Sequence, residues 1–143
     1  MNFSEITQVK NEGKYQINVG WYELIDQMSS LNFTLKQQII RREIEWTDEK
    51  QICYIETRLR GVPLGRDIQL SKPLRTNPII LIDGGQRLLS VLRFLSDEIT
   101  PFGSKFSQFT DPLPLTVDFV FHINKMPHYA DAQEMYRILN EVK

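Results

Sequence analysis

Cysteine, histidine and long apolar runs are scarce in this 143-residue sequence, which has one cysteine, Cys53, and two histidines. A single cysteine excludes an internal disulfide and a cysteine-based zinc site. The two histidines do not form a His-x-x-x-His pair, so the sequence gives no sign of a histidine-based metal site either. No apolar run reaches about 18 residues and no secretory-signal pattern opens the chain, so we expect a cytoplasmic protein without a membrane partner. Cys53 falls in a predicted helix, and we interpret it as a small packed residue rather than a nucleophile. We expect His122 and His128 to be structural or solvent-exposed.

The sequence also lacks a Gly-x-Ser-x-Gly nucleophile motif, a Walker-type phosphate loop and the dinucleotide-binding fingerprint. Its formal net charge of -1 excludes a polycation, but positive charge is concentrated in residues 58–75. If the protein binds DNA, we expect the contact to come from the basic side chains of this segment: Arg58, Arg60, Arg66, Lys72 and Arg75. The alternative is an ordinary solvated surface.

Hydrophobic periodicity and turn residues predict a single domain over residues 1–143. We expect an irregular or partly strand-like arm at 1–17 and a loop at 101–114. Thr47 suits the N-cap of the second helix and Gly61 suits its end. The mixture of elements indicates an α+β fold, a small mixed sheet packed with about four helices. The predicted helices lie near 20–29, 48–60, 86–95 and 130–142, and the predicted strands at 67–70, 78–82 and 115–123.

The chain is organised around a predicted turn from a buried strand into a helix. Asp83-Gly84-Gly85 follows the apolar run at 78–82, and Gln86 and Arg87 open the helix. The first backbone N–H groups of a helix lack intrahelical partners and carry partial positive charge, and glycines let a ligand approach the backbone. The turn is therefore a candidate anion site, above all for phosphate.

Arg87 strengthens this hypothesis, because a cation in the first turn of a helix opposes the helix dipole and needs an anion nearby. That anion is either Asp83 or a ligand. The alternative is that Asp83 caps the helix and pairs with Arg87, while the glycines only make the turn.

Two further places carry side chains suited to a nucleotide. Arg42 and Trp46 place a cation and a large flat ring in a segment before a helix, where such a pair can stack a base or bind a phosphate. The alternative is a surface arginine beside a core tryptophan. Asn140 lies near the end of the last predicted helix, where asparagine is also common for structural reasons.

Three blocks of sequence, in order and at matching spacing, resemble the N-terminal domain of the S half of GmrSD-type modification-dependent restriction enzymes and its stand-alone bacterial and phage relatives. Arg42-Glu43-Ile44-Glu45-Trp46 resembles that family's Gln-Arg-x-x-x-Trp, with Gly61-Val62-Pro63 after the next helix. Asp83-Gly84-Gly85-Gln86-Arg87 resembles its Asp-Gly-Gln-Gln-Arg signature. Tyr136-Arg137-Ile138-Leu139-Asn140 resembles its Phe/Tyr-x-x-Leu-Asn ending, so the resemblance covers about residues 21–143.

The resemblance implies a ParB/sulfiredoxin-like core fold and a site for nucleotide phosphates. Arg87 would pair with phosphate oxygens, Asp83 would hold Mg²⁺ or orient Arg87, and Gln86 would position a water or phosphate oxygen. These three are the implied catalytic residues, whereas the implied nucleotide-binding residues are Arg42, Trp46, Gly84, Gly85 and Asn140. Mg²⁺ and an NTP are the implied cofactor and ligand.

This sequence departs from the family at three positions, two of them just before the first block and one in the second. Ile40-Arg41 replaces the usual Phe/Tyr-Gln before Arg42. Gly85 replaces the first glutamine of the signature, which puts hydrolysis in doubt more than binding. Relatives often continue past Asn140 into a nuclease-bearing domain, so a nuclease-bearing partner is also implied.

The first functional hypothesis is therefore a nucleotide-phosphate-binding domain, either an NTP hydrolase or a ParB-like nuclease, in phage or bacterial DNA restriction or counter-defence. If a phage encodes this protein, we expect it to be located in the cytoplasm of the host cell. The second hypothesis is a DNA-binding or nicking module that uses the basic segment. The third is a non-enzymatic interaction protein.

Overall fold

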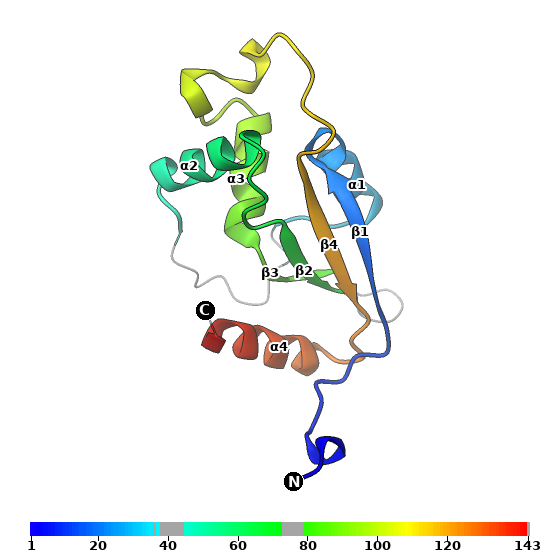
Figure 1. The fold of residues 1–143 in the computed structure, drawn as a ribbon. Helices are drawn as coiled ribbons and strands as arrows, with labels where there is room; N and C mark the ends of the chain where they lie inside the picture. Colours follow the sequence, from blue (N-terminus) through cyan, green and yellow to red (C-terminus); the bar gives the residue numbers. More distant parts are fainter. Residues whose placement is uncertain (36, 38–44, 73–78, 143) are drawn as a thin grey trace.

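The computed structural model describes residues 1–35, 37, 45–72 and 79–142 (Figure 1). In this part of the chain a four-stranded mixed sheet packs against four α-helices, so the α+β prediction is confirmed. The strands are β1 (Lys14–Gly20), β2 (Asp67–Ser71), β3 (Ile80–Asp83) and β4 (Asp118–Asn124). The α-helices are α1 (Leu24–Ser30), α2 (Asp48–Leu59), α3 (Gly85–Leu95) and α4 (Tyr129–Val142), and short 3-10 turns lie at Phe3–Glu5, Trp21–Glu23, Pro101–Gly103 and Phe106–Gln108.

The strands lie in the order β1-β4-β2-β3. β1 is antiparallel to β4, β4 is parallel to β2, and β2 is antiparallel to β3. Between β2 and β3 the register shifts, so that Gln69 lies opposite Asp83 while Leu70 lies opposite Leu81. This irregularity occurs where β3 ends, at Asp83, which is the first residue of the predicted anion site.

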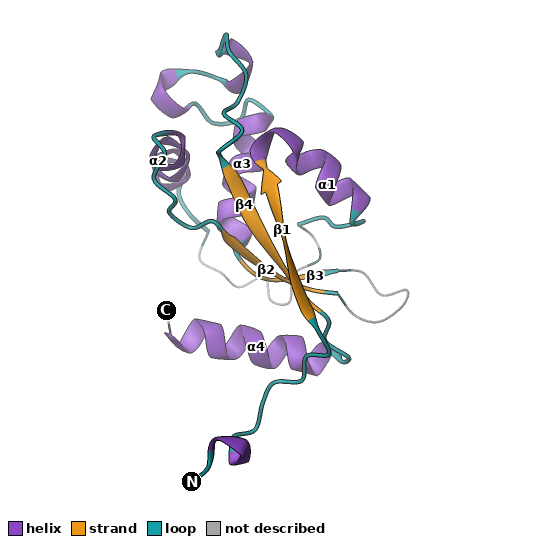
Figure 2. Cartoon of the chain, turned by 45° about the vertical axis from the view of Figure 1, so that its right-hand side comes forward, coloured by secondary structure: helices purple, strands orange, loops and turns teal. Residues whose placement is uncertain are grey.

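Period-two alternation gives the sheet two different faces. Phe119, Phe121 and Ile123 of β4 are fully buried with Ile68 and Leu70 of β2. α1, α2 and α3 contribute to the same core cluster, whereas α4 packs on the other face over β3. Figure 2 shows α4 on the far side of β2 and β3 from α3. Lys14, Gln16, His122 and Gln69 lie beside α4 on a cleft in that second face.

The largest difference from the sequence prediction is β1. The sequence predicts an irregular or partly strand-like arm at 1–17 and a helix near 20–29, but Lys14–Gly20 is a regular edge strand paired with β4 at every position. The helix near 20–29 is a 3-10 turn at Trp21–Glu23 followed by α1, and the last strand begins at Asp118 rather than near 115.

α2 begins and ends where its sequence signals predict. The Thr47 side chain accepts a hydrogen bond from the Lys50 N–H at 3.2 Å and so caps the helix. Asp48 and Glu49 occupy the positive end of the dipole. Gly61 follows the helix at a φ of 87°, a conformation that favours glycine.

Candidate functional site: an aromatic cleft beside Arg87

The predicted strand-to-helix turn is present, but its glycines are covered. Gly84 is the N-cap of α3 with a φ of 106°, and both Gly84 and Gly85 are buried. A Cβ on Gly84 would lie 2.6 Å from Cδ1 of Ile68 and 3.2 Å from Nη2 of Arg87. The space that the missing side chain leaves is therefore filled by the protein. The expectation that these glycines offer open backbone to a ligand is corrected: both are buried, and Gly84 lets Ile68 of β2 and Arg87 pack against the turn.

Arg87 is held beside the turn by packing more than by its ion pair. Its Nη2 lies 3.4 Å from Oδ2 of Asp83, longer than the roughly 2.7–2.9 Å of a strong charge-assisted hydrogen bond. Its stem passes against Gly65, where a Cβ would lie 2.6 Å from Cδ of Arg87. Its Nε is buried and has no hydrogen-bond partner among the described residues. The guanidinium is thus fixed in place while much of its donor capacity is unused.

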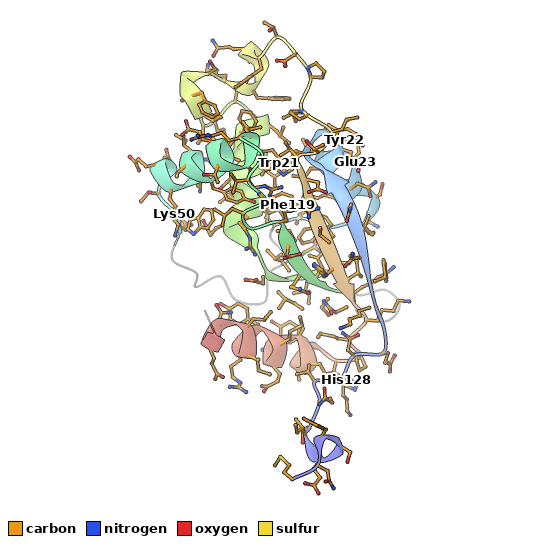
Figure 3. The ribbon with its side chains drawn as sticks, in the orientation of Figure 1. Trp21, Tyr22, Glu23, Lys50, Phe119 and His128 are labelled. Atoms are coloured by element: carbon orange, nitrogen blue, oxygen red, sulfur yellow. The ribbon has the colours of Figure 1, made fainter. Side chains whose placement is uncertain are left out.

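Arg87 forms part of the wall of a cleft of about 290 Å³ between α2 and the turn at Gly65. The other lining residues are Trp46, Lys50, Cys53, Tyr54, Thr57, Leu64 and Gly65. The Trp46 and Tyr54 rings meet edge to face, with centroids 5.6 Å apart. Nζ of Lys50 lies 4.8 Å from the centroid of the Trp46 ring, and Figure 3 shows Lys50 on the outer side of α2. The cleft therefore combines flat apolar walls with two cations.

Gln86 connects the turn to this cleft. Its Oε1 accepts a hydrogen bond from the Trp46 N–H at 3.0 Å. From the other side, Nε2 of Gln51 donates to the Trp46 carbonyl at 3.5 Å. The predicted role of Gln86 was to position a water or a phosphate oxygen. The structure gives its Oε1 a different role, because it holds the backbone of the aromatic wall.

Tyr54 closes the inner wall as a neutral phenol. Its hydroxyl donates to the Gly65 carbonyl at 2.7 Å and accepts from Nη1 of Arg58 at 3.0 Å. Burial raises the pKa of Tyr54 above its ordinary value of 10.0, and the nearby charges of Arg58 and Arg87 only partly oppose this. The turn at Gly65 is thereby tied to α2, which fixes the wall against which Arg87 packs.

The basic residues predicted to contact DNA have different surroundings. The Arg58 side chain is only 3% exposed and donates a hydrogen bond to the Asp118 carbonyl. Its Cζ lies 5.2 Å from the centroid of the Trp21 ring, in the interior where Figure 3 labels Trp21 and Phe119. Arg66 makes two hydrogen bonds to the Asp118 carboxylate, at 2.8 and 2.9 Å. Arg58 is therefore a core residue and not a surface contact. Arg60 and Lys72 are exposed.

Arg42 and Arg75 lie outside the described residues. Asn140 is exposed on α4, where its Nδ2 donates to the Tyr136 carbonyl at 2.8 Å. This is a local helix contact, and no described contact joins Asn140 to the cleft.

Cys53 corrects a further expectation, because it is exposed rather than packed. Sequence reasoning also missed Lys50, Tyr54 and Gly65. The signal for the first two was available, since positions 46, 50, 53, 54 and 57 recur at the three- and four-residue spacing of one helix face. Gly65 could not be found in this way, because its importance depends on a contact with Arg87, which is distant in sequence.

The described residues do not form a metal site around Asp83. No group of three or more His, Cys, Asp or Glu side chains that could hold a metal ion occurs in ranges 1–35, 37, 45–72 and 79–142. The Asp83 carboxylate is mostly buried and contacts Arg87. It does not fit a resident Mg²⁺ by itself, although Mg²⁺ commonly binds through one carboxylate together with substrate phosphates.

Comparison of the chain with protein-family models, curated proteins and solved structures finds no match. The resemblance to the GmrSD S-type domain therefore stays a prediction from three blocks of sequence. None of the helices in the described part of the chain has the length and apolar character needed to cross a membrane.

Proposed function

We propose that this protein is a nucleotide-phosphate-binding domain of the ParB-like, GmrSD S type, with the phosphate at Arg87 and the base against Trp46. The observation that carries the proposal is the Arg87 guanidinium, fixed in the wall of an aromatic cleft with a buried Nε that finds no hydrogen-bond partner in the described part of the chain. An arginine packed in this way has lost part of its hydration. A phosphate oxygen would then supply hydrogen bonds that Asp83 at 3.4 Å provides only weakly.

The composition of the cleft suits a nucleotide better than an inorganic anion. Trp46 and Tyr54 offer flat surface to a base, and Lys50 adds a second cation near the Trp46 ring. The volume of the cleft, about 290 Å³, is close to the lower limit of the roughly 300–1,000 Å³ that small-molecule sites have. We expect a cleft of this size to hold a base, its ribose and the first phosphate, with further phosphates extending into solvent.

Binding is better supported than hydrolysis. Of the three implied catalytic residues, Arg87 would bind phosphate, Asp83 would orient Arg87, and Gln86 would hold Trp46. Mg²⁺ would accompany the phosphates of the nucleotide. The DNA-contact hypothesis is weakened because Arg58 is buried and Arg66 is engaged with Asp118.

Cys53 provides a direct test, because it is the only cysteine, is exposed and lines the cleft. We expect ATP or GTP, with or without Mg²⁺, to slow alkylation of Cys53 by iodoacetamide. Arg87→Ala should remove most of this protection. Arg60→Ala should not, because Arg60 is an exposed arginine just after α2 that does not line the cleft. The proposal would be overturned if neither ATP nor GTP, at millimolar concentration, changed the rate of Cys53 alkylation.

A further inference from the structure

A second and larger cleft, of about 510 Å³, lies on the face of the sheet beside α4. We call it the sheet-face cleft, and its lining residues are Lys14, Tyr15, Gln16, Gln69, His122, Asn124 and Met135. These residues come from β1, β2, β4 and α4, and none of them lines the cleft beside Arg87. The two clefts are therefore separate candidate sites.

Strand register places the polar residues of this cleft in two neighbouring rows. Gln16, His122 and Gln69 lie opposite one another across β1, β4 and β2. Two residues further along β4, Asn124 lies opposite Lys14. Residues two apart in a strand are separated by about 7 Å and share a face. The polar side chains are therefore within reach of one small molecule.

The floor of the cleft is held rigid by a buried amide. Asn124 is only 4% exposed, and its Nδ2 donates to Oε1 of Gln69 at 3.1 Å and to the Leu70 carbonyl at 2.9 Å. Its Oδ1 accepts from Nδ2 of Asn11 at 3.1 Å. Because this network occupies the oxygen of Gln69, the Gln69 NH₂ group is the part of the amide that is left for a ligand.

The remaining groups also favour a ligand rich in hydrogen-bond acceptors. Lys14 contributes an exposed ammonium group, and no acidic residue is among the described residues that line the cleft. The lining residue His122 pairs through its Nε2 with Oδ1 of Asp67 at 2.7 Å, and this contact engages that carboxylate. Met135 of α4 supplies apolar surface.

We propose that the sheet-face cleft binds a small organic anion, a carboxylate or phosphate monoester that carries an apolar group. The anion lies between Lys14 and the NH₂ group of Gln69, and the apolar group lies against Met135. The volume falls within the roughly 300–1,000 Å³ range of small-molecule sites. The assignment does not depend on nucleotide binding at Arg87.

The test is a titration of the ¹⁵N-labelled protein with phenyl phosphate, with phenylacetate and with the neutral 2-phenylethanol, followed by NMR. We expect either anion, but not the alcohol, to shift the side-chain amide signals of Gln69 and Asn124 saturably. Lys14→Met should weaken this binding about three- to tenfold, as expected for loss of one exposed charge contact. Gln16→Ala, a second exposed and fold-neutral change, should weaken it less.

Lys50→Met is the matched control, because Lys50 lines the cleft beside Arg87 instead. It should leave the Gln69 and Asn124 shifts unchanged, while Lys14→Met should leave nucleotide protection of Cys53 unchanged. The proposal is overturned if neither anion shifts these amides up to about 10 mM, well above the concentration expected for weak specific binding. It is also overturned if the alcohol binds equally well, or if Lys50→Met and not Lys14→Met removes the effect.

Discussion

Substitution of Gly65 by alanine tests whether Arg87 is held by packing, as the cleft requires. Gly65 has a φ of 61°, where an alanine costs about 1–2 kcal/mol from its Cβ alone. The new Cβ would also lie 2.6 Å from Cδ of Arg87 and 3.2 Å from the Tyr54 ring. Such overpacking typically lowers the stability of the folded state by roughly a further 1–3 kcal/mol, and the clash would displace the Arg87 side chain. We therefore expect both a loss of stability and a loss of nucleotide protection at Cys53.

Gly61→Ala is the matched control for this substitution. Gly61 has a φ of 87°, but a Cβ there would meet no atom within 4 Å. Urea unfolding should therefore show that Gly65→Ala is more destabilising than Gly61→Ala by about 1–3 kcal/mol. In an Arg87→Ala background this difference should shrink, as a double-mutant cycle measures directly. Equal costs at the two glycines, or full nucleotide protection in Gly65→Ala, would refute the reasoning.

Three further substitutions test the surroundings of the cleft. Because burial raises the pKa of Tyr54, the folded state holds the phenolic proton more tightly than the unfolded chain. The contribution of this group to the free energy of unfolding is fully present below about pH 10 and is lost as the pH rises above it. Urea unfolding should show that this alkaline loss of stability is smaller in Tyr54→Phe. Arg58→Met should cost about 1–3 kcal/mol in thermal or urea unfolding, because buried hydrogen bonds to Tyr54 and Asp118 are lost; wild-type stability would contradict its assignment to the core. Gln86→Leu should release the Trp46 backbone and weaken nucleotide binding with little change in fold, whereas unchanged binding would remove its positioning role.

Much of the local structure follows from short-range signals in the sequence. Thr47 and Gly61 bound α2 because capping and left-handed conformations depend on neighbouring residues. The apolar run before Asp83 and the glycines after it predict the turn from β3 into α3 for the same reason. The α+β class follows from the mixture of elements, and the structure confirms it.

The parts that sequence reasoning missed depend on contacts between distant residues. β1 carries polar residues at Lys14, Gln16 and Asn18, and it is stabilised as a strand by pairing with β4, about a hundred positions away. Arg58 resembles a surface residue in the sequence, but Tyr54 and Asp118 satisfy it in the interior. Gly84 is covered because Ile68 of β2 packs against it.

Two residues of the candidate site, Arg87 and Trp46, were therefore predicted from the sequence, whereas Lys50, Tyr54 and Gly65 were missed. Arg87 and Trp46 are brought to one cleft, as a nucleotide site requires. The helix N-terminus on which the phosphate prediction was based is instead buried, with Ile68 and Arg87 packed on Gly84, and Arg87 lines a cleft together with residues of α2. The cleft itself arises from the packing of α2, α3 and the Gly65 turn, which no local pattern specifies.

The most direct test of the central claim is calorimetric titration of the wild-type protein and of Arg87→Ala with ATP, GTP and their nucleosides. If Arg87 binds phosphate, the nucleotide should bind the wild type more tightly than its nucleoside by about tenfold or more, equivalent to about 1.4 kcal/mol. In Arg87→Ala this preference should disappear. Equal binding of nucleotide and nucleoside to the wild type, or a preference that survives loss of the guanidinium, would contradict the account.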